Sequence, residues 1–275
     1  MTDNGAVQAH YSTNLVIEDI VRALADAGID LDKLTPLDLA PVDQFHSRGL
    51  GATRELGEFL SPKAEERILD IGCGLGGPAR FLAFSHGCRI DGIDLTPAFC
   101  EAAKRLTGMT RLDDQVAIEC ASALEMPFED DTFDAAYSQN VVMNIADKAA
   151  FYGEARRVLK AGGRLALSNL TQGPGGAPVY PTPWAETAAT SFLSTPEETH
   201  EVIEAAGFEI LVFRNTTERL RHFYETQRER IRRQGPPKLG IHVFMGERIK
   251  GMQRNVAKNV EEGRVIPFEI LCRKL

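Results

Sequence analysis

A glycine-rich segment, residues 69–77 (LDIGCGLGG), constrains the fold of this chain more than any other part of the sequence. It follows a short apolar run and precedes a helical pattern, so it predicts a strand, a tight turn and a helix. Such a turn presents backbone N–H groups at a helix N-terminus, and its glycines let a ligand approach closely because they lack a Cβ. The segment therefore predicts an α/β fold with a ligand site at the turn.

The spacing of the glycines and a later carboxylate indicate the kind of ligand. Gly72, Gly74 and Gly77 match the pattern of adenosine-cofactor turns, and Asp94 ends the next expected strand, where it can accept hydrogen bonds from ribose hydroxyls. This pattern alone fits a nicotinamide dinucleotide or S-adenosylmethionine. Asp70 favours the second, because a carboxylate beside the turn repels a pyrophosphate but suits a sulfonium and an ammonium group.

The rest of the chain alternates between strand and helix patterns, which predicts a doubly wound parallel sheet. We expect strands at 67–71, 89–94, 115–120, 133–138, 164–169 and 208–213, with helices at 78–86, 96–106, 147–159 and 195–206. A last strand at 265–273 should be antiparallel, because a long connection precedes it. Further helical patterns cover 14–28, 217–233 and 245–262. Residues 36–52 hold two prolines and predict a loop that leads into a helix ending near Leu60, and residues 171–185 predict a long loop.

Three later segments, residues 122–128, 131–134 and 158–165, complete a recognisable set. Together with the glycine turn they resemble the class I S-adenosylmethionine-dependent methyltransferases over about residues 60–170, and more weakly over 195–275. Residues 43–46 and 184–197 are similar to the sarcosine/dimethylglycine N-methyltransferases, a branch that we group with the ubiquinone/menaquinone-type methyltransferases. The resemblance implies S-adenosyl-L-methionine as cofactor and S-adenosyl-L-homocysteine as product. It also implies a Rossmann-like seven-stranded sheet whose last strand is antiparallel and lies between strands five and six.

The resemblance divides the chain into three parts. Residues 1–60 would form an N-terminal helical cap or lid, and residues 61–170 the S-adenosylmethionine-binding core. Residues 171–275 would complete the sheet and carry substrate-cap helices inserted at about 217–262.

The family's cofactor contacts carry over to individual positions. Glycines of the turn would line the methionine and ribose, Asp94 would hold the ribose hydroxyls, and Leu95 would pack on the adenine. The full set is Asp70, Gly72, Cys73, Gly74, Gly76, Asp94, Leu95, Ser122, Ala123, Leu124 and Asn140. Ser122 departs from the family, which often has an aspartate there near the adenine amino group. A weaker hydrogen bond or a backbone contact would have to replace that carboxylate.

The acceptor side is less constrained by the sequence. His46 is the candidate general base, and Tyr11 resembles an N-terminal tyrosine that covers the cofactor in relatives, so both are assigned as catalytic. Relatives that methylate hydroxyls often have a histidine after strand four, where this chain has Met143 and Asn144. We therefore expect a small-molecule acceptor with an amine nitrogen; the alternative is C- or O-methylation of a quinone-like or other secondary metabolite. Candidate substrate-binding residues are Gln44, Asn144, Trp184 and Phe223.

Composition limits the partners. The 275 residues carry 31 Lys and Arg against 39 Asp and Glu, a net charge of −8, which argues against nucleic acid as a partner. No apolar run approaches the ~18 residues that span a bilayer, so we expect no stable membrane association. The five cysteines form no CxxC pair, which predicts reduced thiols, no metal site and a cytoplasmic location. The sequence is also compatible with a homodimer.

Three alternatives stay open at this point. The arginine-rich stretch at 219–233 could recognise an acidic acceptor or an anionic membrane, or could be an ordinary solvated helix face. A dinucleotide-dependent oxidoreductase is a competing function for the glycine turn. A cofactor-binding relative without catalysis is another, because fold does not determine function.

Overall fold

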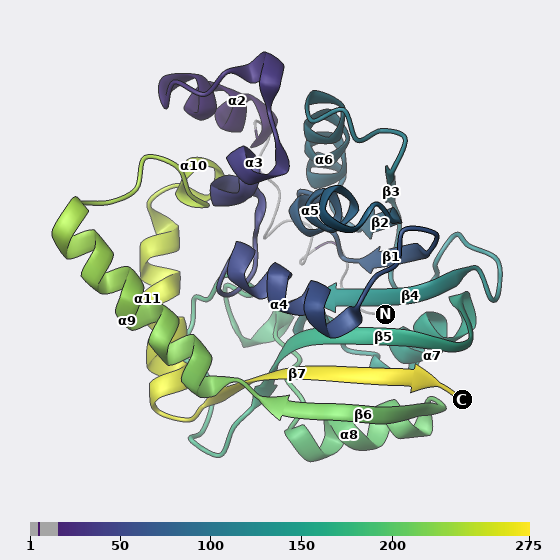
Figure 1. The fold of residues 1–275 in the computed structure, drawn as a ribbon. Helices are drawn as coiled ribbons and strands as arrows, with labels where there is room; N and C mark the ends of the chain where they lie inside the picture. The colour runs from purple at the N-terminus through teal and green to yellow at the C-terminus, as the bar shows by residue number, and fades with distance from the viewer. Residues whose placement is uncertain (1–4, 6–15) are drawn as a thin grey trace.

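The computed structural model describes residue 5 and residues 16–275, and its centre is a seven-stranded sheet in the order β3-β2-β1-β4-β5-β7-β6 (Figure 1). The strands are β1 (Arg67–Ile71), β2 (Arg89–Asp94), β3 (Val116–Cys120), β4 (Phe133–Gln139), β5 (Leu159–Gln172), β6 (Phe208–Asn215) and β7 (Val265–Lys274). Strand β7 pairs antiparallel with both β5 and β6, whereas β1 to β5 pair in parallel. The predicted sheet, including the antiparallel strand between strands five and six, is confirmed.

The glycine turn joins β1 to α5 (Gly77–His86) as predicted. The N–H groups of Gly72 and Cys73 donate to the Ile93 carbonyl at 2.8 and 2.9 Å, which fixes the turn against the end of β2. Gly72 has φ +81°, and a Cβ there would lie 2.3 Å from Cγ2 of Val141. Only glycine fits this position, because both the backbone conformation and the space exclude a side chain.

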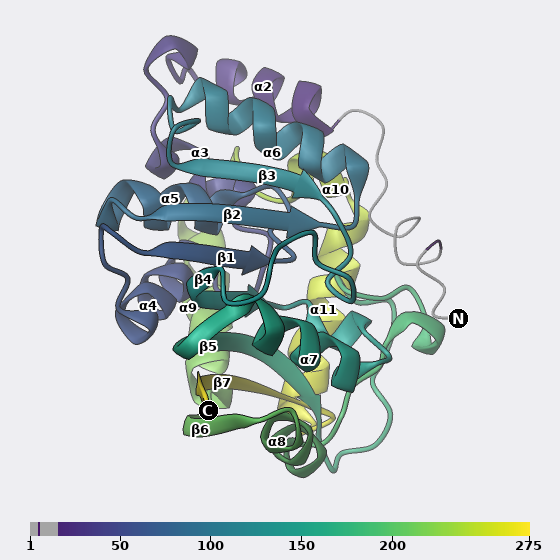
Figure 2. The same ribbon diagram turned by 90° about the vertical axis from the view of Figure 1, so that its right-hand side faces the viewer.

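Helices cover both faces of the sheet. Helices α7 (Lys148–Val158) and α8 (Pro196–Ala205) contribute to an apolar cluster on one face, which includes Phe151, Val158 and Ile203. Helices α4 (Leu50–Leu60), α5 and α6 (Pro97–Met109) contribute to the cluster on the other face. Figure 2 shows the arrowheads of β1, β2 and β3 pointing toward one edge of the sheet, which is the edge where ligands bind in folds of this kind.

A cap lies over this edge and is built from both ends of the described chain (Figure 1). It comprises α2 (Val16–Asp26), α3 (Pro36–Asp43), α9 (Thr217–Gln234), α10 (His242–Met245) and α11 (Arg248–Glu261). One apolar cluster joins Ile20 and Leu39 near the start of the chain to Phe244 and Met252 near its end. The N-terminal segment and the helices inserted at about 217–262 therefore share a core.

Some local expectations were wrong. Residues 36–43 form helix α3 rather than loop, because Thr35 and Asp38 make a capping box and Pro36 occupies a first-turn position where its missing N–H costs nothing. Strand β5 begins at Leu159, earlier than expected, and pairs there with Phe133. The pattern at 245–262 is interrupted, since Gly246 has φ +65° and ends α10 before α11 begins.

Candidate functional site

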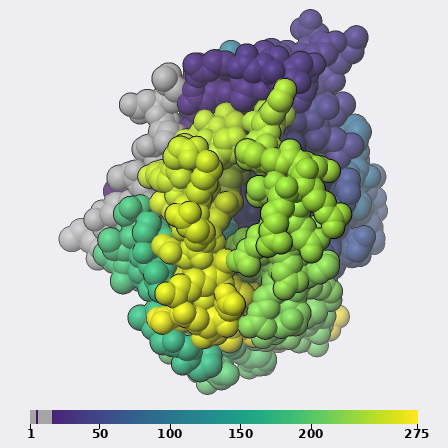
Figure 3. Space-filling view, turned by 90° about the vertical axis from the view of Figure 1, so that its left-hand side faces the viewer, coloured from purple at the N-terminus to yellow at the C-terminus, as the bar shows by residue number. Residues whose placement is uncertain are grey.

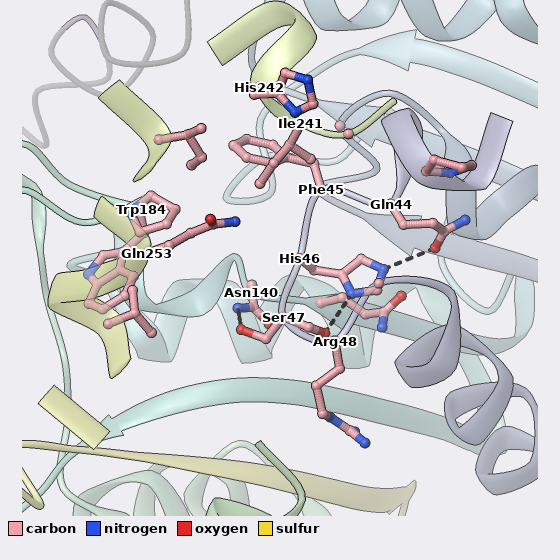
Figure 4. Close-up of a pocket in the computed structure, with 18 of the residues that line it drawn as sticks. Gln44, Phe45, His46, Ser47, Arg48, Asn140, Trp184, Ile241, His242 and Gln253 are labelled. Atoms are coloured by element: carbon pink, nitrogen blue, oxygen red, sulfur yellow. Dashed lines mark hydrogen bonds between the residues drawn. The ribbon is translucent and has the colours of Figure 1, made fainter. Parts of the chain in front are cut away.

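One large cavity, of about 1380 Å³, lies between the cap and the carboxyl ends of the parallel strands. Its walls come from the glycine turn, the residues that follow β2, β3 and β4, the segment 44–50, and cap residues of α9 to α11. Figure 4 shows His46 and Gln44 on one side of this space and Trp184 and Gln253 on the other. The cavity is therefore bordered by segments that are far apart in the sequence, from Ala27 to Ala257.

The structure brings most of the predicted site residues to this cavity. Those that line it are Gln44, His46, Gly72, Gly74, Asp94, Leu95, Ser122, Ala123, Leu124, Asn140, Asn144, Trp184 and Phe223. Asp70, Cys73 and Gly76 are buried behind the turn and are not part of the lining. Tyr11 lies outside the described residues.

Asp94 links the turn to the cavity wall. Its Oδ2 accepts from the N–H of Gly74 at 2.9 Å, and its Oδ1 accepts from the N–H of Thr96 at 2.8 Å. Burial raises the pKa of this carboxyl, while the two backbone donors oppose that rise. Oδ2 thus ties the end of β2 to the glycine turn that follows β1, and Oδ1 fixes the backbone directly after β2, so Asp94 has a structural role as well as a place in the cavity wall.

Asp70 has a different environment. It is buried, and Tyr137 Oη donates to its Oδ2 at 2.9 Å. Burial raises the pKa of Asp70 to about 8, and the negative charge of Asp94 adds to the rise. A carboxyl of this kind lies close to its point of ionisation at neutral pH, so a nearby positive charge would favour its ionised form.

His46 is held by the protein at both ring nitrogens (Figure 4). Its Nδ1 lies 3.2 Å from the Ser47 carbonyl, and its Nε2 lies 3.1 Å from Gln44 Oε1 and 3.0 Å from Thr53 Oγ1. Burial is the main cause that lowers the pKa of His46 to about 4; the hydrogen bond to Ser47 opposes this change, and the charge of Arg48 contributes to it. The ring is therefore neutral near pH 7 and carries one N–H, which donates either from Nδ1 to the Ser47 carbonyl or from Nε2 to Gln44 Oε1.

Two buried amides in the lining are unsatisfied. Gln139, at the end of β4, is 7% exposed, and neither its Oε1 nor its Nε2 has a hydrogen-bond partner within the described residues. The same is true of Nε2 of Gln44. Buried amides are nearly always hydrogen-bonded, so these atoms point to a polar ligand group in the cavity. Sequence reasoning missed Gln139; the available signal was a polar residue at the carboxyl end of an apolar parallel strand.

Asn140 and Asn144 hold neighbouring segments around the cavity. Asn140 has φ +57°, and its Nδ2 donates to Ser47 Oγ at 3.2 Å, which ties the end of β4 to the segment 44–50. Asn144 Nδ2 donates to the carbonyls of Trp184 and Thr190 at 2.6 and 3.0 Å. These contacts fix the proline-rich loop, so the two residues shape the walls through the segments they fasten.

A buried ion pair fastens α3 to the glycine turn. Arg80 of α5 and Asp43 of α3 are both fully buried, with Nη2 and Oδ2 at 2.9 Å. Nη1 of Arg80 also donates to the Ala103 carbonyl and to Thr107 Oγ1, each at 3.2 Å. A Cβ on Gly77 would lie 2.4 Å from the Asp43 carbonyl oxygen, so this glycine permits the close approach.

Comparison with known proteins agrees with this geometry. Residues 69–167 match the family model described as a methyltransferase domain. Sarcosine/dimethylglycine N-methyltransferase from Halorhodospira halochloris is 26% identical over 214 residues, which are 78% of this chain and 76% of that protein. The chain therefore carries a methyltransferase domain over residues 69–167, and beyond that domain it is similar to S-adenosylmethionine-dependent methyltransferases.

One further relative and one solved structure are also similar to this chain. O-methyltransferase resE from Aspergillus sclerotiorum is 33% identical over 174 residues, 62% of this chain. The aligned region spans 64% of resE, somewhat less than two thirds of its length. The crystal structure of the [4+2]-cyclase SpnF has a TM-score of 0.67 and 24% identity, and the match covers 93% of each chain. This last likeness shows a shared fold.

The methyltransferase family uses S-adenosylmethionine, and two features of the lining fit that cofactor. Gly74 has φ +53° and borders the cavity, and a Cβ built on it meets nothing within 4 Å. The turn therefore leaves open space at the place where the cofactor would approach the backbone. The unsatisfied amides of Gln44 and Gln139 supply donors and acceptors for a zwitterionic end group.

The described residues contain neither a metal-binding cluster nor a membrane-spanning helix. Across residues 16–275, no group of three or more His, Cys, Asp or Glu side chains is placed to hold a metal ion. Within the same part of the chain, no helix has both the length and the apolar character needed to cross a membrane.

Proposed function

We propose that this chain transfers a methyl group from S-adenosylmethionine, by in-line displacement, to the amine nitrogen of a small molecule. One observation carries the proposal: the open glycine turn, Asp94 and the unsatisfied amides face a single cavity that the cap closes from the other side. A cofactor held at the strand ends would thus share this space with an acceptor held by the cap.

The proposed cofactor contacts follow from the lining. Asp94 would accept from the ribose hydroxyls, Leu95 and Leu124 would pack against the adenine, and Gln44 and Gln139 would bind the methionine end. When bound, S-adenosylmethionine supplies an electrophilic methyl group on a positively charged sulfur. The chain's own task is to orient the acceptor and exclude water around it.

The environment of His46 favours an amine over a hydroxyl. A neutral amine needs no base before it attacks, because its proton can leave to solvent afterwards. A hydroxyl acceptor usually needs a positioned base. His46 is neutral but both of its nitrogens already contact the protein, at 3.0 to 3.2 Å. We therefore assign His46 as a positioning residue that holds segment 44–50 against the cavity.

O-methylation is the second candidate, supported by the relative resE, which is an O-methyltransferase by name. It requires the His46 ring to turn so that Nε2 leaves Gln44 and Thr53 and faces the acceptor. The two candidates therefore differ in what His46 must do. His46→Gln, which keeps hydrogen-bonding capacity but not basicity, should spare amine methylation and abolish hydroxyl methylation.

The test combines binding and turnover. Isothermal titration should show binding of S-adenosylhomocysteine and no binding of NAD. A panel of amines, phenols and quinols is then incubated with S-adenosylmethionine, and S-adenosylhomocysteine release is measured. Turnover confined to phenols or quinols would replace the amine by an oxygen or carbon acceptor. Cofactor binding without turnover on any compound would favour a role that does not transfer the methyl group.

A further inference from the structure

Positive charge is concentrated in one part of an acidic chain. Residues 227–254 contain eight Arg and Lys residues but only two acidic ones, Glu229 and Glu247, whereas the whole chain has a net charge of −8. These residues form the end of α9, the connection that follows it, α10 and most of α11. Such asymmetry within one chain points to a charged partner rather than to solubility alone.

Part of this charge borders the mouth of the cavity. We define the cationic rim as Arg228, Arg230, Lys238 and Arg254, all of which line the cavity and are exposed. Figure 3 shows a hollow between α9, in green, and α11, in yellow, so the two helices that carry most of the rim flank an opening. The rim is therefore accessible from solvent and continuous with the cavity.

Three of the four α9 arginines outside the rim lie within ion-pair distance of a glutamate. Arg219 contacts Glu55 at 2.7 Å, Arg221 contacts Glu218 at 2.7 Å, and Arg233 is 4.0 Å from Glu229. None of the four rim residues forms an ion pair with any residue of the described chain. An ordinary solvated helix face alternates paired charges, as the first turns of α9 do. The rim instead holds several unneutralised cations around one opening.

The walls inside the rim are mostly apolar. Phe45, Trp184, Ile241 and Val256 line the interior, and Trp184 and Val256 are buried in an apolar cluster. Close to the rim, Leu37 and Ile231 are exposed large apolar residues that also line the cavity. A ligand that matches both regions has an apolar body inside the cavity and an anionic group at its mouth.

We infer that the cationic rim selects an acceptor with an apolar body and a carboxylate, phosphate or sulfate group at the end remote from the methylated atom. The inference rests on the proposed function, because it assigns the remaining part of the same cavity to the acceptor. Arg228 and Arg254, on opposite helices, would bind the anion from both sides of the opening. The guanidinium groups suit this role because they can donate two parallel hydrogen bonds to one anionic group.

The test uses Trp184, the chain's single tryptophan, which lines the cavity. Its fluorescence is titrated with 4-nitrobenzyl phosphate and with the uncharged 4-nitrobenzyl alcohol, with and without S-adenosylhomocysteine. Nitroaromatic groups quench tryptophan, so quenching reports occupation of the cavity. We expect the phosphate to bind at least tenfold more tightly than the alcohol, and this advantage to shrink as salt rises.

A matched pair of double variants locates the effect. Arg228→Gln with Arg254→Gln should reduce the phosphate advantage to less than threefold. Arg232→Gln with Arg233→Gln removes the same charge from the end of α9, at residues that do not line the cavity, and should leave most of the advantage. Equal losses in both double variants, or equal binding of the two probes to the unmodified chain, would overturn the inference.

Two further readouts separate this inference from the alternatives. S-adenosylhomocysteine affinity should be unchanged in both double variants. If S-adenosylhomocysteine does not bind, the proposed function is rejected. The inference about the rim is tested separately, by the probe titrations carried out without S-adenosylhomocysteine. Binding to phosphatidylglycerol vesicles, combined with no preference for the phosphate probe, would assign the charge to a membrane surface and overturn the inference.

Discussion

Gly74 is where the backbone itself makes room for a ligand. Its φ of +53° disfavours side chains, and a Cβ would project into the cavity without meeting another protein atom. We expect Gly74→Val to weaken S-adenosylhomocysteine binding at least 100-fold, about 2.7 kcal/mol, as measured by isothermal titration. Gly162→Val is the control, since it has φ +73° and open space but lies outside the cavity. Similar affinities in the two variants would contradict the proposed approach of the cofactor to the turn.

Asp94 should contribute to binding and to stability. Because its oxygens accept from Gly74 and Thr96, Asp94→Ala removes two structural hydrogen bonds along with the proposed ribose contact. Asp94→Asn keeps one carbonyl oxygen, so it should cost less stability while still weakening cofactor binding by about 1.5–3 kcal/mol. Titration with adenosine and 2′,3′-dideoxyadenosine isolates the ribose term. If the unmodified protein and Asp94→Asn prefer adenosine over 2′,3′-dideoxyadenosine to the same degree, Asp94 does not bind the ribose hydroxyls.

Asp70 predicts a pH dependence of stability. Its pKa is about 8 in the folded chain against an ordinary value of 3.8, so the folded state holds a proton that the unfolded state has lost. The free energy of unfolding should therefore decrease as pH rises from about 4 to about 8. Asp70→Asn keeps an acceptor for Tyr137 but removes the titration. Urea unfolding at pH 5 and pH 8 should show a smaller decrease in the variant, by on the order of 2–4 kcal/mol. If the free energy of unfolding decreases equally in the unmodified protein and in Asp70→Asn, a group other than Asp70 is responsible for the pH dependence.

Among single residues, the sequence predicted those site positions that neighbouring residues in the chain identify. Gly74 and Asp94 follow strands at a recognisable spacing, and the structure brings both to the cavity. Gln139 was missed because it is notable only for its side-chain amide, which has no hydrogen-bond partner among the described residues. The absence of a partner can be seen only in the three-dimensional structure. Likewise, nothing in the sequence indicated that both nitrogens of His46 would be occupied.

Among the elements, the junction between α3 and α5 depends on the Arg80–Asp43 pair. Removing one partner leaves an uncompensated buried charge, so Arg80→Met or Asp43→Asn should each lower the free energy of unfolding by about 3–5 kcal/mol. The double variant should lose less than the sum of the two, because it buries no unpaired charge. Urea denaturation of the four proteins gives the coupling energy. Strict additivity would show that the pair is not coupled and that α3 is held by apolar contacts alone.

Helices and strands were predicted correctly where residues close together in the sequence were enough to determine them. Thr195, Pro196 and Glu198 form the expected cap of α8, and the apolar runs of β1 and β2 are strands. Helix α3 was missed because two prolines suggested a loop, although one lies in the first turn and the other is tolerated within the helix. The start of β5 was missed because its first pairing, with Phe133, is tertiary.

For the whole molecule, the strand order was predictable through the family resemblance, whereas the cap was not. Residues near Ile20 pack against residues near Met252, a contact between segments that are remote in sequence and carry no shared local pattern. The charge on α9 was visible in the sequence, but whether those arginines were paired or unpaired depended on the positions of Glu55 and Glu218. The strand order could therefore be predicted from local motifs, whereas the acceptor end of the cavity could not, because it is formed by packing between distant segments.

The position of β7 between β5 and β6 has a consequence for how the chain is made. Strand β6 pairs with no strand of the sheet except β7, yet β7 leaves the ribosome after it and after all of α9, α10 and α11. An emerging chain therefore holds β6 and the cap helices without their central neighbour, so these parts must wait while β1 to β5 can already assemble. Formation of the cavity mouth is thus a late event in synthesis that requires pairing over a long stretch of chain, which is a slow class of folding step.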